Sequence, residues 1–353
     1  MNRIFSFLIF VFLFGCIEEI EVFKGSSDSF VVDGAITTEP GPHRIKLSYS
    51  RQYNTKPTFE KVEGAIVTIV DDEGQEEQLT YTENGYFVTS PAFSAVPGKS
   101  YQLKIKLKSG DEFESIPEKC ISVPALQNVS ARMNGTVLDF FADFTDDPAE
   151  ENYYRWRYNG TFEFVAPVAY EMSRTNQQMK KSDCITWEGP APFAKDIYRC
   201  WVKEFDAEYL KIDDDLLFNG REMKDVFLYS MDLQQKFNHG YYAEVKQYSL
   251  TKSAYIYWKA IKDQMSNNGT IFETTNYQIR GNLRSLQDPD ENVLGYFGVS
   301  AVSAKAVFVG EFIGLYGEIA CELNNSGCYP ERCMDCRRAA STASTTKPAY
   351  WPY

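Results

Sequence analysis

Histidine is scarce in this sequence, with only His43 and His239 among 353 residues. No HExxH motif is present, which excludes a zinc peptidase of that type. A serine hydrolase needs a Gly-x-Ser-x-Gly turn, and the nearest segment, residues 298–302, lacks the final glycine. Residues 98–100 resemble the end of a phosphate-binding loop, but Phe93 stands where its first glycine belongs. We therefore predict that the protein is not an enzyme and carries no cofactor.

Basic residues are also in the minority. Lys and Arg number 36 against 49 Asp and Glu, which gives a formal net charge of -13. Nucleic acids bind to basic surfaces that displace counterions from the phosphates, so no nucleic-acid partner is expected. Two acidic groups, residues 213–215 and 288–291, offer ligands for calcium. Neither has the twelve-residue pattern of an EF-hand, so solvated turns are the simpler interpretation and we predict no metal site.

The apolar run at the amino-terminus is short. Residues 4–14 are apolar except for Ser6, whereas a helix that crosses a bilayer needs roughly 20 residues. Arg3 precedes this run and Gly15-Cys16 follows it, which is the layout of a secretory signal peptide ending before a lipidated cysteine. We predict a signal peptide over residues 1–15, acylation of Cys16 and a lipidated tether over residues 16–27. The lipid would then hold the protein on a membrane.

Acidic residues follow Cys16 closely, at Glu18, Glu19 and Glu21. One interpretation is a solvated linker. The other is an export signal, because these residues resemble the sorting signal of surface-exposed lipoproteins of Bacteroidota.

From residue 30 onward, short segments of β-strand character alternate with turns. They cover residues 30–36, 45–49, 64–70, 85–88 and 101–107, and the turns contain Gly, Pro and Asp. Strands that recur about every ten residues are typical of a β-sandwich. We predict a β-sandwich domain over residues 28–124, Ig-like or carboxypeptidase-regulatory-like, which Pro117 and Pro124 close.

The middle of the chain combines further strands with one prominent helix. Ser249 or Thr251 is expected to cap this helix and Gly269 to end it. Its apolar face is formed by residues at helical spacing, namely Ala254, Trp258, Ile261 and Met265. Strands are expected at residues 137–143, 152–158, 295–302 and 305–309. We predict a β-rich α+β domain over residues 125–320 and a mainly-β fold for the whole chain.

The sequence contains eight cysteines: Cys16, Cys120, Cys184, Cys200, Cys321, Cys328, Cys333 and Cys336. An exported protein meets an oxidising compartment, where spaced cysteines form disulfides. With Cys16 acylated, one thiol of the remaining seven stays reduced, and the isolated Cys120 is the candidate. We predict a Cys184–Cys200 bridge and two bridges among the last four cysteines, for which three pairings are possible. Zinc ligation by these four is the weaker alternative, because only one C-x-x-C unit, residues 333–336, is present.

The carboxyl-terminal segment, residues 321–353, is a Cys-rich and low-complexity tail. A Ser/Thr/Ala tract over residues 339–346 cannot form a core of its own, and it precedes Tyr350, Trp351 and Tyr353. These aromatic rings either dock in a groove, on this chain or on a partner, or belong to a disordered end.

A set of short motifs spans nearly the whole mature chain. Beyond the lipobox, they lie at residues 31–37, 40–42, 46–48, 62–65, 153–156, 200–201, 255–259, 281–283, 294–297 and 347–351. Together they resemble the Bacteroidota lipoproteins of the family called domain of unknown function 4249. The resemblance implies no catalytic residue. The motif aromatics and glycines are most simply fold determinants.

The resemblance also implies a setting. Family members are similar in this respect to lipoproteins that accompany TonB-dependent transporters. We therefore expect a lipid-anchored outer-membrane protein, facing the exterior, that is a non-enzymatic accessory or substrate-binding partner of such a β-barrel transporter. The alternative is a structural or assembly protein of the cell envelope that binds no small molecule.

Overall fold

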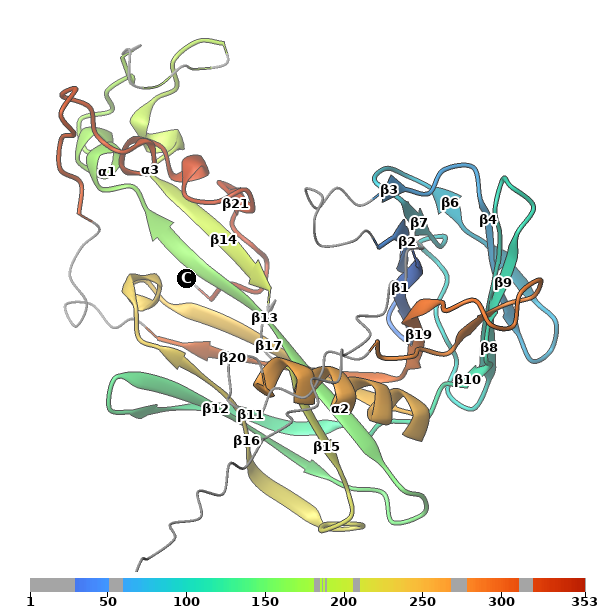
Figure 1. Ribbon diagram of the computed structural model, residues 1–353. Coiled ribbons are helices and arrows are strands. Elements are labelled where there is room, and N and C mark those ends of the chain that lie inside the picture. Colours follow the sequence, from blue (N-terminus) through green and yellow to red (C-terminus); the bar gives the residue numbers. More distant parts are fainter. Residues whose placement is uncertain are drawn as a thin grey trace, which may run out of the picture.

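The computed structural model describes residues 29–50, 60–180, 185, 187, 189–205, 210–267, 278–310 and 320–352 (Figure 1). In this part of the chain, strands predominate and two pairs of sheets enclose separate cores. The predicted mainly-β fold with one prominent helix is therefore confirmed. No helix of the described residues is long and apolar enough to cross a membrane.

The first sandwich consists of two six-stranded sheets around one core. One sheet has, in spatial order, β19 (Leu294–Ser300), β1 (Phe30–Thr37), β2 (Arg44–Tyr49), β7 (Tyr86–Val88) and β6 (Thr80–Tyr81), with β3 (Glu60–Lys61) beside β2. The other has β18 (Leu283–Ser285), β9 (Glu112–Ser115), β8 (Ser100–Lys106), β4 (Ile66–Asp71) and β5 (Glu76–Gln78), with β10 (Glu118–Lys119) beside β8. Residues 101, 103 and 105 of β8 are buried and their neighbours are not, which is the alternation of a strand with one face in the core.

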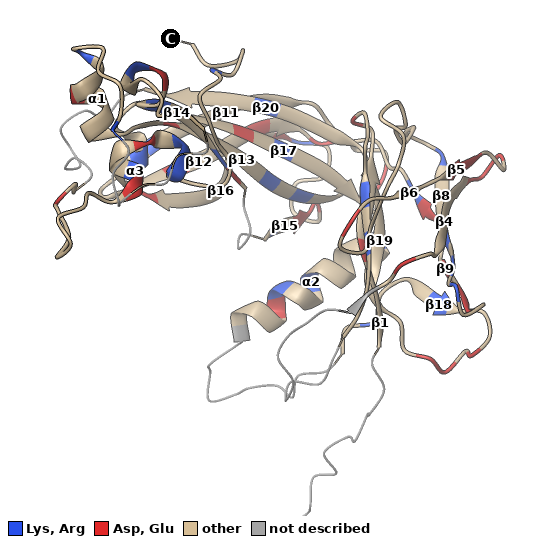
Figure 2. Ribbon diagram, turned by 90° about the horizontal axis from the view of Figure 1, so that it is seen from above, with Lys and Arg blue, Asp and Glu red and all other residues tan. Residues whose placement is uncertain are grey.

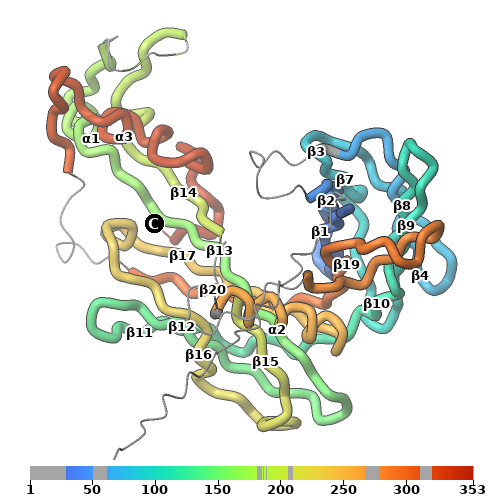
Figure 3. The backbone as a smooth tube through the Cα atoms, viewed as in Figure 1, coloured from blue at the N-terminus to red at the C-terminus, as the bar shows by residue number. Residues whose placement is uncertain are grey.

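Two strands of this sandwich come from far along the chain. β19 pairs in parallel with β1, from Val31 opposite Leu294 to Thr37 opposite Ser300, and β18 pairs with β9. Figure 3 shows this late segment, in orange, beside the blue and cyan strands. The assignment of residues 125–320 to one second domain is therefore wrong for residues 283–301. Alternation of apolar residues identifies a strand but not the sheet that it joins, because pairing depends on distant partners.

Glycine is required where β19 meets its neighbours. Gly295 has a φ of 90°, and a Cβ atom there would lie 1.9 Å from the carbonyl oxygen of Val32. A Cβ atom on Gly281 would lie 1.4 Å from the carbonyl oxygen of Gly295. Between them, the Asn282 amide donates to the Phe297 carbonyl and accepts from the Phe297 N–H, both at 2.9 Å. The Asn282 side chain thus makes the hydrogen bonds to Phe297 that a neighbouring strand would make. The backbone at residues 281 and 295 can approach its neighbours this closely only because both residues are glycines.

The second sandwich packs a three-stranded sheet against a six-stranded one. The smaller sheet has β11 (Leu126–Asn134), β12 (Val137–Thr145) and β16 (Glu222–Asp232). The larger has β20 (Val302–Val309), β17 (Tyr241–Leu250), β13 (Tyr153–Val165), β14 (Arg199–Phe205) and β21 (Ala343–Ser344), with β15 (Lys211–Asp214) beside β13. Aromatic rings fill the space between the sheets, as where Phe140 stacks on Tyr229 with ring centroids 4.5 Å apart.

One of the passages between the two sandwiches is a single residue long. β19 belongs to the first sandwich, β20 to the second, and only Ala301 separates them. Ala301 is buried, its N–H donates to the Ser249 hydroxyl at 2.9 Å, and its carbonyl accepts from the Ser249 N–H at 3.1 Å. No flexible linker is needed at this point.

Helix α2 (Lys252–Asn267) lies in the angle between the two sandwiches (Figure 2) and contacts β13, β15, β17 and β19. Thr251 caps it, because the Thr251 hydroxyl accepts from the Ala254 N–H at 3.1 Å. Of the predicted apolar face, Ala254 is buried whereas Met265 is 50% exposed. The predicted stop at Gly269 lies outside the described residues.

A buried carboxylate joins α2 to the first sandwich. Glu118 is 2% exposed, and its two oxygens accept four side-chain hydrogen bonds from three segments. The Tyr296 hydroxyl donates at 2.5 Å, the Thr251 hydroxyl at 2.6 Å, the Ser253 hydroxyl at 3.1 Å and the Asn282 amide at 3.3 Å. A buried charge is stable only when hydrogen bonds replace its lost hydration. Thr251 and Ser253 stand at the start of α2, where the helix dipole also favours a negative charge.

We expect Glu118→Ala to lower the free energy of unfolding by about 3 kcal/mol, because it leaves several buried donors without an acceptor. Urea denaturation of the purified chain measures this change. The matched control is Lys119→Ala, which alters the exposed neighbour on the same strand. Equal midpoints for the two variants would show that the carboxylate does not hold the sandwiches together.

Over the described ranges, the fold also contains five short helical turns: α1 (Pro167–Ser173), η1 (Ala194–Asp196), η2 (Gln235–Phe237), α3 (Glu331–Met334) and η3 (Cys336–Arg338). α1 contacts both η1 and α3, and η3 contacts β14 and β21. Figure 1 shows α1 and α3 together near the amino-terminal end of β14. This end of the second sandwich therefore has small cores of its own, around Cys200 and around Trp187.

The aromatic tail docks on its own chain. β21, within the Ser/Thr/Ala tract, pairs with Trp201 and Val202 of β14. The Tyr350 ring stacks on Tyr242 with centroids 4.3 Å apart. Trp351 is 3% exposed and meets the Phe308 ring edge-on at 5.1 Å. Of the alternatives left open by the sequence, docking on this chain is the one that occurs, and Tyr353 lies outside the described residues.

Trp351→Ala should lower the free energy of unfolding by about 2 kcal/mol, since it exposes the apolar surface that the indole covers. Tyr350→Phe is the milder control, because it removes only the 2.9 Å hydrogen bond between the tyrosine hydroxyl and Thr161. Its expected effect is below about 1 kcal/mol. Urea denaturation monitored by circular dichroism compares the two, and an unchanged midpoint for Trp351→Ala would contradict docking.

Candidate functional site

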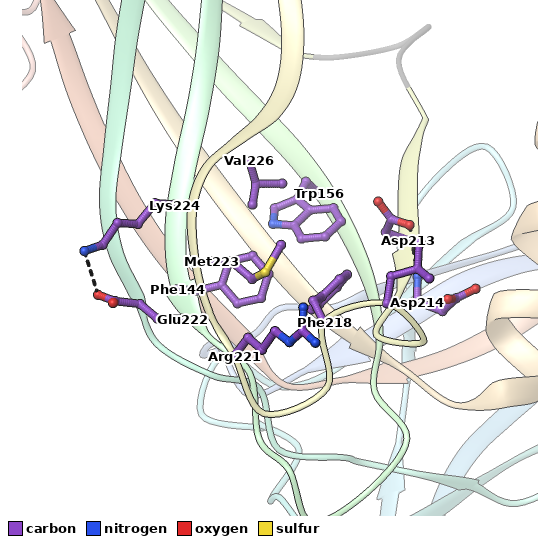
Figure 4. A pocket seen from close by; sticks show the side chains of 11 residues that line it. Phe144, Trp156, Asp213, Asp214, Phe218, Arg221, Glu222, Met223, Lys224 and Val226 are labelled. Carbon is purple, nitrogen blue, oxygen red and sulfur yellow. Dashed lines mark hydrogen bonds and ion pairs between the residues drawn. The ribbon is translucent and has the colours of Figure 1, made fainter.

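An open cavity of about 560 Å³ lies in the second sandwich, where the connection from β15 to β16 crosses the end of the sheets (Figure 4). Five strands or turns contribute to it. Its lining residues are Phe144, Trp156, Asp213, Asp214, Leu217, Phe218, Arg221, Glu222, Met223, Lys224 and Val226. The set combines an apolar floor with a charged rim, the usual composition of a small-molecule site.

The floor of the cavity is part of the protein core. Phe144 and Trp156 are 0% and 2% exposed, and their ring centroids lie 6.0 Å apart. The Trp156 indole N–H donates to the Gln247 side chain at 2.8 Å, which fixes the ring. Phe218 meets Phe144 edge-on at 6.2 Å and is itself only partly buried. The floor is therefore rigid, and Phe218 offers the aromatic surface that a ligand can reach.

Two buried carboxylates hold the wall that carries Phe218. Asp146 accepts from the Gly220 N–H at 2.8 Å and from the Tyr154 hydroxyl at 2.5 Å. Asp215 accepts from the Asn152 N–H at 2.8 Å. Burial and the hydrogen bond to Asp146 raise the pKa of Tyr154 far above its usual value, so its hydroxyl remains a donor. The connection is thus fixed although it lies at the surface.

Most rim charges are already compensated. Lys224 pairs with Glu222 at 3.2 Å, as the dashed line in Figure 4 marks, and Lys211 pairs with Asp213 at 3.2 Å. Asp214 differs, because its oxygens accept only neutral donors in the described structure. These are the Tyr255 hydroxyl at 2.8 Å and the Leu216 N–H at 3.2 Å.

Arg221 is the counterpart of Asp214. Its guanidinium makes no hydrogen bond or ion pair with any described residue, although it lines the cavity. Burial and the hydrogen bond to Asp214 raise the pKa of Tyr255 above its usual range, so Tyr255 stays protonated and cannot neutralise Arg221. The rim therefore presents one cation and one carboxylate that have no partner of opposite charge in the described structure.

The cavity lining consists of aromatic, aliphatic and charged side chains. The lining set contains no histidine, serine or cysteine. His43 lies in the first sandwich, where it is buried beside Phe93, and burial lowers its pKa. Over the described ranges, no group of three or more His, Cys, Asp or Glu side chains is placed to hold a metal ion.

Comparison with known proteins places the chain in a family. The sequence profile of "Domain of unknown function (DUF4249)" matches residues 17–306. The chain belongs to this DUF4249 family. No curated protein matches the chain.

Solved structures offer only distant likenesses to this DUF4249 chain. A DUF4785 family protein from Legionella pneumophila is 13% identical, with 62% of this chain and 52% of that chain covered and a TM-score of 0.19. The present chain thus spans about half the length of that protein. A two-domain fibronectin type-III segment of chicken tenascin is 11% identical, with 63% and 91% covered and a TM-score of 0.17. A putative carbohydrate binding protein from Bacteroides uniformis is 10% identical, with 64% and 92% covered and a TM-score of 0.14.

Three of the motifs that carry the DUF4249 resemblance lie where parts of the fold meet. The motif at residues 281–283 contains Gly281 and Asn282, and that at 294–297 contains Gly295 and Tyr296, all at the junction with α2. Trp258 of the motif at residues 255–259 lies against the Arg155 guanidinium, whose central carbon is 3.7 Å from the ring centroid. These residues are fold determinants. Of all the motif residues that the structure describes, Trp156, in the motif at residues 153–156, is the one that lines the cavity.

The predicted disulfide cysteines that the structure describes pair differently than expected. Cys200 is bonded to Cys336, so the predicted Cys184–Cys200 bridge is wrong. The prediction of two bridges among the final four cysteines is also wrong, because Cys336 pairs outside this set. Cys321 is bonded to Cys333, and this is the one bridge of the described structure that lies wholly within the set. Cys328 is also disulfide-bonded, whereas Cys184 and the lipidation candidate Cys16 lie outside the described residues.

The cause of the wrong pairing is the path of the chain. η3 returns to β14, and the Cys336 N–H donates to the Ile197 carbonyl at 2.9 Å, which brings its sulfur to Cys200. The prediction paired Cys200 with Cys184 because a short loop costs less entropy to close than a long one. Cys120 is free, as predicted, and its burial in the first core raises the pKa of the thiol to about 11.

Sequence reasoning missed the cavity. The sequence predicts a solvated turn for the acidic residues 213–215. In the structure, Asp213 and Asp214 line the cavity and Asp215 is 4% exposed. The signal in the sequence was the apolar run Leu216-Leu217-Phe218 directly after three aspartates, in which both leucines prove to be exposed, at 82% and 83%. Its meaning depends on Phe144 and Trp156, which only the fold brings close.

Mapping of disulfide-linked peptides should recover Cys200–Cys336 and Cys321–Cys333. Trypsin leaves Cys333 and Cys336 in one peptide, so Asp-N, which cuts before Asp335, is needed with Glu-C, which cuts after Glu322. Cys120 should react with iodoacetamide only after unfolding, because it is buried and its thiol is not ionised at neutral pH. A peptide linking Cys184 to Cys200 would contradict the observed pairing.

Proposed function

We propose that this DUF4249 protein is a lipid-anchored outer-membrane protein, exposed on the cell surface, that acts as a non-enzymatic accessory or substrate-binding partner of a TonB-dependent transporter. The observation that carries the proposal is the cavity of about 560 Å³ with its rigid aromatic floor and charged rim. Its size and composition suit a small organic ligand. The lining side chains combine aromatic and aliphatic surface with charged groups, which favours capture of a ligand.

The place of the anchor supports the same role. The predicted acylation site, Cys16, stands fourteen positions before Phe30, where the first strand begins. Covalent geometry limits this segment to roughly 50 Å when fully extended. A ligand bound in the cavity would thus stay near the membrane in which a transporter lies.

Rigid connection of the two sandwiches supports it further. The passage through Ala301 and the Glu118 hydrogen bonds leave little freedom between the anchored sandwich and the one that holds the cavity. A carrier that must present its ligand in a defined orientation benefits from such a connection, because less conformational freedom is lost on docking.

Affinity purification from outer membranes tests the partnership. A tag in the exposed turn at Gly74 avoids the docked tail, and a mild detergent keeps membrane complexes intact. We expect a TonB-dependent β-barrel to co-elute with the wild-type chain but not with Cys16→Ser, which lacks the acyl acceptor. Recovery of the wild-type chain from membranes without any barrel would contradict the partnership.

Protease treatment of intact cells tests the orientation separately. A surface-exposed chain should be cleaved at the same protease concentration as a known surface lipoprotein, while a periplasmic marker survives. Cys16→Ser serves as the control, because without its lipid it is not retained on the surface. Full protection of the wild-type chain would place it on the inner face of the membrane instead.

A further inference from the structure

The rim of the cavity has one unmatched charge of each sign. Lys224 and Asp213 line it, but each already has an ion-pair partner at 3.2 Å. Arg221 has none in the described part of the chain, and Asp214 accepts only from an N–H and a hydroxyl. A ligand that carries one carboxylate and one ammonium group would match both.

We propose that the cavity binds a short apolar peptide in its zwitterionic form. Its carboxylate would pair with the Arg221 guanidinium, its ammonium group with Asp214, and its side chains would cover Phe218 and Met223. This assignment rests on the proposed substrate-binding role, because it names the substrate class of the same site.

Arg221 suits a terminal carboxylate for reasons of geometry. A guanidinium presents parallel N–H donors that match both oxygens of a carboxylate. Because Arg221 is exposed and makes no competing hydrogen bond in the described structure, no existing ion pair must break when the ligand arrives. Figure 4 shows its side chain on the same side of the cavity as Met223, with Phe218 between it and Asp214.

Asp214 suits an ammonium group for a related reason. Its carboxylate is oriented by the Tyr255 hydroxyl and the Leu216 N–H, each of which occupies one oxygen. Two oxygens accept about four hydrogen bonds, so acceptor positions remain for an ammonium group. Tyr255 belongs to α2, so the helix sets the direction of this carboxylate.

The cavity also has apolar walls, and its volume suits a short peptide. Phe218, Met223 and Val226 are partly buried, and Leu217 is 83% exposed at the mouth. At about 30 Å³ for each water in the liquid, 560 Å³ corresponds to roughly nineteen waters, which is the volume range of a dipeptide or tripeptide. Apolar side chains gain the most in such a site, because they displace water from apolar walls.

Isothermal titration calorimetry at pH 6.5 with four forms of leucylphenylalanine tests the proposal on the wild-type chain. The forms are the free dipeptide, its N-acetyl derivative, its carboxyl-terminal amide and the doubly blocked peptide. We expect the free dipeptide to bind at least about tenfold more tightly than either singly blocked form, since each block removes one charged contact. Equal affinities for the free and doubly blocked forms, or no binding of the free form at millimolar concentration, would overturn the proposal.

Variants assign each charge to its residue. Arg221→Gln should weaken binding of the free dipeptide about tenfold and leave the affinity for the carboxyl-terminal amide unchanged. Asp214→Asn should also weaken binding of the free dipeptide about tenfold, but leave the affinity for the N-acetyl form unchanged. Lys224→Gln and Asp213→Asn are matched controls, because they remove lining charges of the same signs that are already paired. Loss of affinity in the controls equal to that in Arg221→Gln and Asp214→Asn would show a general charge effect and contradict the assignment.

The outcome is separable from that of the proposed function. A barrel that co-purifies while no peptide binds would overturn the ligand class and leave the partnership intact. Peptide binding without any co-purified barrel would support the ligand class and contradict the partnership. Melting temperatures show whether each variant keeps its fold under the conditions of the titration, and the comparison of blocked and free peptides on the wild-type chain does not depend on the variants.

Discussion

The Glu118 carboxylate is the point on which the arrangement of the molecule depends. It is buried, so it must be met by donors, and those donors come from the start of α2, from Asn282 and from β19. The first sandwich thereby fixes the position of α2. The helix in turn places the Tyr255 hydroxyl on Asp214 at the rim of the cavity. A single chain of hydrogen-bonded contacts thus runs from the core of one sandwich to the candidate site of the other.

The sequence predicted what depends on neighbours along the chain. Alternating residues of β8, the Thr251 cap and the isolation of Cys120 are local patterns, and each agrees with the structure. The set of motifs also identified the DUF4249 family, whose profile matches residues 17–306. Short-range rules suffice for these features, because strand period, capping and burial of a lone apolar residue need no knowledge of distant partners.

Features that depend on distant partners were not predictable in the same way. The return of residues 283–301 to the first sandwich rests on close backbone approach at Gly281 and Gly295, which a sequence pattern does not reveal. Cys336 reaches Cys200 across 136 positions, so a pairing rule based on loop length chose wrongly. The cavity combines residues from Phe144 to Val226, and its two unmatched charges become visible only when the ion pairs of their neighbours are known.

The parallel pairing of β1 with β19 has a mechanical consequence. A pull on the residues before Phe30 acts on the amino-terminal end of β1, whereas the second sandwich holds β19 at its opposite end through Ala301. The two strands are then loaded in shear, and their ladder of hydrogen bonds, from Val31 to Thr37, resists as a group. A ladder pulled in this direction cannot open one bond at a time, as a strand peeled from its end does. The fold therefore transmits tension from its amino-terminus to the cavity-bearing sandwich along its most force-resistant direction.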